Sequence, residues 1–318
     1  MSYVPKVTVL LPVYNTEKFV RQAIESILGQ TFTDFELLII DDASSDNTLR
    51  IVKLFSDPRI RIIENKQNLK LAKTLNIGLK EARGEYVARM DDDDIAISER
   101  FEKQIAYLDS QVDISLAGTA ITFIDEDGEF GSSREVPQTS VGTAYELMYG
   151  NPIFHSSIMF RKSDIISIGG YDESFDYAQE YDLYIRLLES GYKVANINQV
   201  LMYFRKRLNS ALSSPSSQSI IRQNSLKTSL RAMNFATNID ENEFERSKDL
   251  LIVKRPIRRF SFRFLIDCLS LHKRLLYRFI QGKKLSLKER HEIMKYYKWR
   301  KKIIWRRFLA SRFSQSLS

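Results

Sequence analysis

The chain has 318 residues, of which 43% are hydrophobic and 28% charged, as in a soluble globular protein with one large domain and an appendage. Its single cysteine, Cys268, excludes a disulfide framework within the chain, which fits a reducing compartment. Residues 1–6 lack the pattern of a signal peptide, and no stretch approaches the roughly 18 to 20 apolar residues that span a bilayer.

The net charge of +8 is divided unevenly along the chain. Residues 251–318 contain 20 Lys+Arg and 3 Asp+Glu, a net of +17, so residues 1–250 carry 8 − 17 = −9. The basic tail is therefore the part expected to contact an anionic surface.

Strand-like and helical patterns alternate over the first 110 residues. The expected strands are Lys6–Leu11, Phe35–Ile40, Arg59–Ile63 and Glu85–Met90, and the expected helices are Glu17–Leu28, Asp46–Phe55, Leu69–Ala82 and Glu99–Leu108. This order predicts βαβ units and an α/β fold with a mostly parallel central sheet flanked by helices, with ligands beyond the carboxyl ends of the strands. Asp41, Asp42 and the run Asp91–Asp94 follow such strand ends.

The pattern is mixed from Ile114 to Phe160. A hairpin turn is expected at Glu126–Gly128, a strand at Ser157–Phe160 and a helix at Ala178–Leu188. The serine-rich stretch Asn209–Ser219 reads as a linker. The expected domains are therefore a catalytic domain at 1–208, a linker at 209–219 and a basic α-helical extension at 220–318.

The run Asp91–Asp94 places four carboxylates side by side. Like charges in contact raise one another's pKa unless a cation lies among them, and carboxylate oxygens suit Mg²⁺ or Mn²⁺. The alternative is a solvated acidic turn that caps the next helix. A zinc site is poorly supported by three histidines and one cysteine.

Neither a Gly-x-Gly-x-x-Gly nor a Walker loop occurs. Five other segments, in order, carry the informative motifs: Val7–Asn15, Gln30–Glu36, Ile40–Asp46, Gly84–Asp94, and Gly169–Glu173 with Glu180–Arg186. Over about residues 5–205 the chain resembles the family 2 glycosyltransferases, which are nucleotide-sugar enzymes with the GT-A fold.

The resemblance implies a nucleotide site formed by the opening segment, with Pro12 and Tyr14, and by Asp42 and Lys73. Tyr14 would stack on the base, or else cover the core as a rim aromatic. Asp42 would accept the imide N–H of uracil, which favours UDP over GDP or CDP, or else cap a helix. Lys73 would line the pocket, or else lie on a solvated helix face.

The resemblance gives each acid of the run a role. Asp91 would hold the ribose, Asp93 would bind Mn²⁺ or Mg²⁺, and Asp92 would only assist. Asp94 would fix the loop or cap the next helix. The metal would neutralise charge on the departing UDP.

Glu180 matches the catalytic base of the family, although the family more often has Asp there, preceded by an acid where this chain has Gln179. Asp182 is the second candidate, and its alternative is an ion pair with Arg186 at i+4. His155 would contact the diphosphate or an acceptor hydroxyl, or else serve structure.

The basic tail combines amphipathic helical spacing with Trp299 and Trp305, which suits an anionic membrane surface. One alternative is a helical lid on the catalytic domain. Nucleic-acid binding is another, but no recognition motif supports it.

These features together predict an inverting, metal-dependent glycosyltransferase. It would move a hexose or N-acetylhexosamine from a UDP-sugar to a hydroxyl acceptor, a lipid-linked glycan precursor of O-antigen, capsule or other surface polysaccharide. It would be cytoplasmic and peripheral on the inner face of the plasma membrane. The alternatives are another nucleotide-sugar enzyme on a similar sheet, and a non-catalytic membrane- or nucleic-acid-binding adaptor whose acidic loop binds Ca²⁺.

Overall fold

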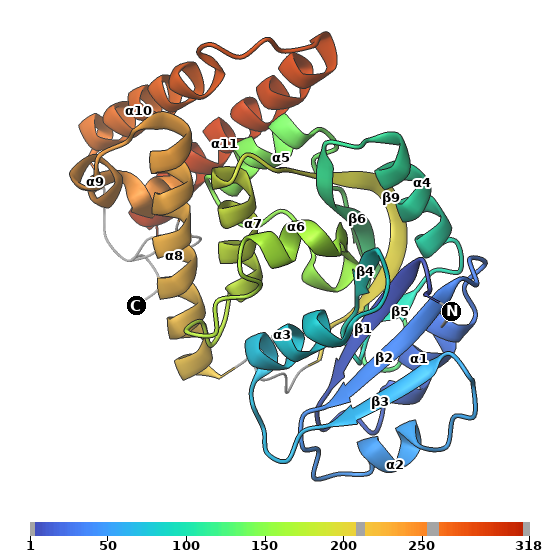
Figure 1. The fold of residues 1–318 in the computed structure, drawn as a ribbon. Coiled ribbons are helices and arrows are strands. Elements are labelled where there is room, and N and C mark those ends of the chain that lie inside the picture. The colour runs from blue at the N-terminus through green and yellow to red at the C-terminus, as the bar shows by residue number, and fades with distance from the viewer. Residues whose placement is uncertain (1–3, 208–213, 253–260, 314–318) are drawn as a thin grey trace. The chain divides into compact units, whose positions relative to one another are not determined.

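The computed structural model describes residues 4–207, 214–252 and 261–313, and the chain divides into two compact units (Figure 1). The sheet unit comprises Met1–Ser140 and Ile153–Asn224, and the helical unit comprises Val141–Pro152 and Ser225–Ser318. The division after Asn224 falls inside helix α8 (Pro215–Thr237), so part of the linker expected at 209–219 is helical. Residues 208–213 of that linker lie outside the described residues.

In the sheet unit, the described strands form one sheet in the order β3-β2-β1-β4-β8-β6-β9-β5, with β7 paired to β6. The strands are β1 (Val7–Val13), β2 (Phe35–Asp41), β3 (Ile60–Glu64), β4 (Tyr86–Arg89), β5 (Ile95–Ala96), β6 (Ile114–Ile124), β7 (Phe130–Arg134), β8 (Met159–Arg161) and β9 (Lys193–Arg205). The helices are α1 (Val20–Leu28), α2 (Thr48–Val52), α3 (Leu71–Glu81), α4 (Arg100–Ser110), the 3₁₀ helix η1 (His155–Ser157), α6 (Lys162–Ser167) and α7 (Gln179–Glu189).

The parallel half of the sheet, β1 to β4, agrees with the sequence prediction. Every residue of β1 and β2 is buried, as expected of strands covered on both faces. Helix α1 packs with Val9 and Leu11 in one core, whereas α3 covers the opposite face. There a Cβ added to Gly78 would lie 2.2 Å from Leu10 Cδ1, so α3 approaches the sheet too closely for a larger residue.

The other half of the sheet is mixed rather than parallel. Strand β8 runs antiparallel to β4 and β6, and β5 runs antiparallel to β9. The long strands β6 and β9 pair in parallel with register shifts. The hairpin expected at Glu126–Gly128 is confirmed between β6 and β7, with Gly128 at φ +91°.

The helical unit contains α5 (Ser140–Leu147) from residue 141 onward, the second part of α8, α9 (Glu241–Leu251), α10 (Phe262–Ile280) and α11 (Leu287–Phe313). Its core combines Tyr145 and Met148 with Leu265, Leu275 and Phe279. Segment 141–152 therefore belongs to this unit although it lies in the first half of the sequence. None of the helices in the described ranges is long and apolar enough to cross a bilayer.

Candidate active site

The carboxyl ends of β1, β2 and β4 meet at one edge of the sheet, where the sequence predicts the ligand site. The parallel register pairs Val13 with Asp41 and Leu10 with Arg89, so the loops that follow these strands are neighbours. Pro12, by contrast, is buried inside β1 opposite Ile40, so it shapes the strand end and presents no exposed face.

Asp92 joins the loop after β1 to the loop after β4. Its Oδ2 accepts hydrogen bonds from the backbone N–H of Tyr14 at 2.9 Å and from Thr16 Oγ1 at 2.5 Å. The carboxylate is buried, whereas the Tyr14 side chain is 46% exposed. Asp92 thus fixes the backbone that presents the Tyr14 ring at the strand edge.

Asp93 and Asp94 are held by the end of β9. Oδ2 of Asp93 lies 2.7 Å from Arg207 Nε, an ion pair without hydrogen-bond geometry, and its carbonyl oxygen accepts from Arg205 Nε at 2.9 Å. Oδ1 of Asp94 accepts from the backbone N–H of Arg205 at 2.8 Å. Its Oδ2 is buried and has no hydrogen-bond partner within the described part of the chain.

The carboxyl groups of Asp92, Asp93 and Asp94 are harder to ionise than a free carboxyl group. Burial, and then the nearby carboxylates, raise the pKa of Asp92, Asp93 and Asp94. The orphaned oxygen of Asp94 and these raised pKa values fit a place where a hard cation would bind.

The described residues contain no group of three or more His, Cys, Asp or Glu side chains arranged around one metal position. A magnesium-type ion does not need such a group, because it commonly binds through one or two carboxylates together with substrate phosphates and water. The donor set therefore fits an ion that enters with a diphosphate, and Asp93 is the residue to which the family resemblance gives that role.

Arg89 is a site residue that the sequence reading missed. Its side chain is 1% exposed, and its Nη2 donates a hydrogen bond to Asp91 Oδ1. The backbone N–H of Asp91 donates to Ser156 Oγ at 2.9 Å. Arg89 Nε and Nη1 are buried and have no hydrogen-bond partner among the residues described. An arginine inside the apolar strand 86–90 was the available signal, because a buried cation needs an acid nearby.

Asp42 already has three hydrogen-bond donors. Oδ1 accepts from Asn65 Nδ2 at 2.8 Å and from the Leu69 N–H at 2.9 Å, and Oδ2 accepts from the Lys70 N–H at 3.0 Å. The carboxylate therefore holds the β3–α3 connection and does not cap the next helix, the alternative drawn from sequence. Oδ2 keeps one acceptor position that a ligand N–H could fill.

The two lysines near the nucleotide loops differ in their contacts. Lys73 is exposed on α3. Lys70, which precedes α3 with φ +68°, places its Nζ 2.6 Å from Asp176 Oδ1. This ion pair joins the start of α3 to the loop before α7. Both groups are largely exposed, so the pair contributes little to stability.

The two candidate bases both lie on helix α7 but differ in burial. Glu180 lies in the first turn and is partly exposed. Asp182 is buried, and its Oδ2 accepts from Arg186 Nε at 2.7 Å, so the expected i, i+4 ion pair is present. Arg186 also donates to the carbonyl oxygens of Ile168 and Gly170. Asp182 is thus committed to a structural contact.

Two buried tyrosines, Tyr171 and Tyr184, are influenced by charged residues of the candidate site. The pKa of Tyr184 is raised by burial and then by the charges of Tyr171 and Glu180, and that of Tyr171 by burial and then by Glu180 and Asp91. Arg89 opposes the shift at both hydroxyls. The negative charges of Glu180 and Asp91 both disfavour the ionised form of these two hydroxyls.

His155 lies in η1 beside this pair. Its Nε2 is 2.9 Å from Tyr171 Oη, and burial followed by the Arg89 charge lowers its pKa well below the ordinary value. The imidazole is accordingly neutral at pH 7. It can exchange hydrogen bonds with a ligand but offers no positive charge to a diphosphate.

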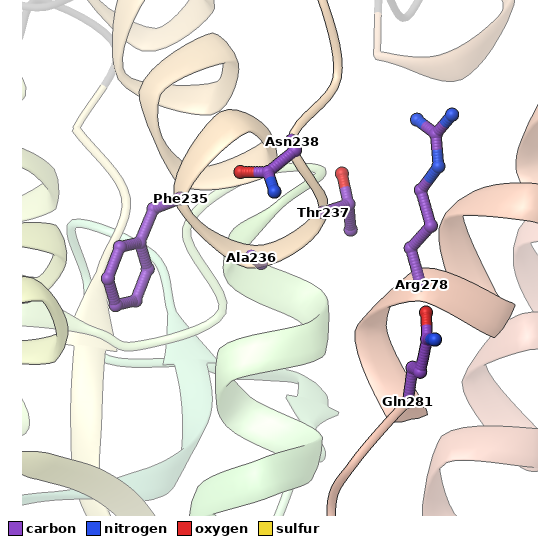
Figure 2. Close-up of a pocket in the computed structure, with 6 residues that line it drawn as sticks. All are labelled: Phe235, Ala236, Thr237, Asn238, Arg278 and Gln281. Atoms are coloured by element: carbon purple, nitrogen blue, oxygen red, sulfur yellow. The ribbon is translucent and has the colours of Figure 1, made fainter.

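A separate pocket of about 340 Å³ lies in the helical unit (Figure 2). It is lined by Phe235, Ala236, Thr237, Asn238, Arg278 and Gln281. None of the predicted site residues borders it, so the chemistry is assigned to the sheet edge.

Comparison with known proteins shows the family of the chain. The family model described as glycosyl transferase family 2 matches residues 8–169. EpsE of Bacillus subtilis, named as a glycosyltransferase, is 36% identical over 65% of this chain and 75% of its own length. The amylovoran biosynthesis glycosyltransferase AmsE of Erwinia amylovora is 35% identical over 62% and 75%. The O-antigen biosynthesis glycosyltransferase WbnJ of Escherichia coli is 32% identical over 63% and 79%.

Solved structures share the fold at low sequence identity. S. aureus TarS 1–349 in complex with UDP-GlcNAc has a TM-score of 0.60 at 16% identity, over 98% of this chain and 91% of that one. A longer TarS chain is matched over 55% of its length. The mannosyltransferase PcManGT of Pyrobaculum calidifontis, in complex with GDP-Man and Mn²⁺, has a TM-score of 0.55 at 14% identity, over 99% and 89%.

Proposed function

Since the chain belongs to glycosyl transferase family 2 and has the GT-A fold, we propose that it transfers a hexose or N-acetylhexosamine from a UDP-sugar to a hydroxyl acceptor, with inversion at the anomeric carbon. The observation that carries the proposal is the edge of the sheet, where Asp92 joins the loop after β4 to the loop that carries the exposed Tyr14. The UDP-GlcNAc bound by TarS supports the donor class.

The donor would be bound by the loops that follow β1, β2 and β4. Tyr14 offers an exposed ring for the base, and Asp42 Oδ2 offers an acceptor to the imide N–H of uracil. Asp91, oriented by Arg89 and Ser156, would accept from the ribose hydroxyls. Asp93 would hold Mn²⁺ or Mg²⁺, which supplies charge neutralisation to the departing UDP.

Glu180 would take the proton from the acceptor hydroxyl while the oxygen of that hydroxyl attacks the anomeric carbon. The bond between that carbon and the UDP oxygen breaks in the same displacement, so one carboxylate suffices. Glu180 is favoured over Asp182 because Asp182 is buried against Arg186. A neutral His155 would donate or accept a hydrogen bond on the acceptor side.

The acceptor would be a lipid-linked glycan precursor in surface-polysaccharide synthesis, as the names of AmsE and WbnJ suggest. The protein would then work at the inner face of the plasma membrane, with its basic helical unit against anionic lipid. The catalytic domain would extend over 1–208 and the basic region over 220–318.

The test is UDP release from a panel of UDP-sugars with Mn²⁺, with and without a glycan acceptor. We expect turnover with one sugar, and inhibition by EDTA. Glu180→Gln should reduce turnover at least about 100-fold. Glu189→Gln, at the last position of the same helix, is the matched control. Pyrophosphate as the product would indicate a nucleotidyl enzyme, and full turnover by Glu180→Gln would refute the assignment of the base.

A further inference from the structure

Four large apolar side chains share one surface of the helical unit, where α10 begins and α11 approaches its end. Phe262 and Ile266 lie one turn apart on α10 and are 55% and 47% exposed. Trp305 and Leu309 lie one turn apart on α11 and are 36% and 46% exposed. These four residues are called the apolar patch below.

The apolar patch is one cluster rather than scattered residues. The ring centroids of Phe262 and Trp305 are 6.3 Å apart, and both rings contact Phe308 at 6.3 and 6.2 Å. Phe308 is buried, so it supports the two exposed rings from below. The rings are thereby held outward, and contiguous exposed apolar surface of this kind marks an interaction site.

Basic side chains surround the apolar patch. Arg263, Lys302 and Arg306 are exposed next to its members in sequence, and the only nearby acid on α10 is Asp267. Helices α10 and α11 together contain 14 Lys+Arg and 3 Asp+Glu. A partner that covers this surface must therefore be anionic as well as able to bury apolar groups.

An anionic bilayer meets both requirements. Tryptophan and phenylalanine favour the boundary between headgroups and acyl chains, and each basic residue near an anionic surface adds about 1 kcal/mol. The bases of a nucleic acid would stack on the rings, but a nucleic acid would not bury the aliphatic side chains of Ile266 and Leu309. A second copy of the chain would bring its own residues 251–318, with a net charge of +17, to the same surface.

We propose that the apolar patch inserts into the headgroup region of an anionic lipid bilayer while the surrounding arginines and lysines contact lipid phosphates. The proposal rests on the membrane location put forward above and names the surface that binds. It does not require sugar transfer, so the two can fail separately.

The chain offers a direct probe because Trp299 and Trp305 are its only tryptophans. In Trp299→Phe, Trp305 is the sole reporter. Vesicles of phosphatidylglycerol and phosphatidylcholine at 1:1 should shift its emission to the blue, and brominated acyl chains should quench it. Vesicles of pure phosphatidylcholine should bind at least about tenfold more weakly, because the charge contribution is lost.

Cosedimentation of the full chain tests the residues of the apolar patch. The double variant Phe262→Ser/Trp305→Ser should lower partition to anionic vesicles at least about tenfold. Tyr277→Ser is the control, because Tyr277 is 65% exposed on α10 but four turns from Phe262. Circular dichroism should be unchanged in both.

Three results would overturn the proposal: no shift of Trp305, wild-type partition by the double variant, or binding of an RNA of equal charge without binding of vesicles. UDP release is measured in the same preparations without vesicles. Absence of UDP release would refute the proposed reaction and leave the vesicle result valid. UDP release without vesicle binding would refute only the proposal that the apolar patch binds lipid.

Discussion

Replacing Asp182 by asparagine should lower the stability of the sheet unit and spare the candidate base. The side chains of Asp182 and Arg186 are 3% and 18% exposed, and the Nε–Oδ2 distance is 2.7 Å. Asparagine keeps an acceptor oxygen, and Arg186 keeps two carbonyl partners. The loss is therefore close to that of one charge-assisted hydrogen bond, about 2 kcal/mol. For a unit of this size that corresponds to roughly 4 to 8 °C in Tm.

Glu180→Gln should show the opposite behaviour, because Glu180 is partly exposed. Its Tm should stay within about 1 °C of wild type while UDP release falls at least about 100-fold. Thermal unfolding followed by circular dichroism and a UDP-release assay at 25 °C measure both variants. If Asp182→Asn loses turnover as completely as Glu180→Gln at unchanged Tm, then Asp182 is the base and the reasoning from burial is wrong.

Three further predictions concern single side chains. Asp93→Ala should abolish the Mn²⁺ dependence of UDP binding measured by calorimetry. The fold should not be destabilised, because the substitution relieves repulsion among buried acids. If UDP binding still depends on Mn²⁺ in this variant, another residue binds the metal. Arg89→Met should raise the Kd of UDP at least about tenfold because Asp91 loses its orienting donor, and an unchanged Kd would contradict this. Burial lowers the pKa of His272 to about 4, so this side chain should contribute a loss of up to about 3 kcal/mol in the stability of the helical unit as pH drops from 6.5 to 4. Denaturant unfolding measured from pH 6.5 to 4 should show this loss of stability in the control variant His291→Gln but not in His272→Gln.

The sequence alone was sufficient for the parallel half of the fold. Strands β1 to β4 and helices α1, α3 and α4 lie within a few residues of the expected bounds, because short apolar runs and helical spacing are local patterns. The two longest strands, β6 and β9, were not predicted. Residues 114–121 of β6 are all buried, Ser115 and Thr119 included, so no alternation of apolar and exposed polar residues marks the strand. The β6–β9 pairing also joins segments about 80 residues apart.

For the site, the sequence by itself determined which acids follow a strand end and which family the motifs resemble. Tertiary structure decided what each acid does, because hydrogen bonds between distant residues set those roles. Asp92 contacts the loop after β1, Asp94 contacts the end of β9, and Asp182 is held by Arg186. The sequence does not distinguish a carboxylate that is buried and paired from one that lies beside solvent. Only the neighbouring residues in space determine which of the two states it adopts.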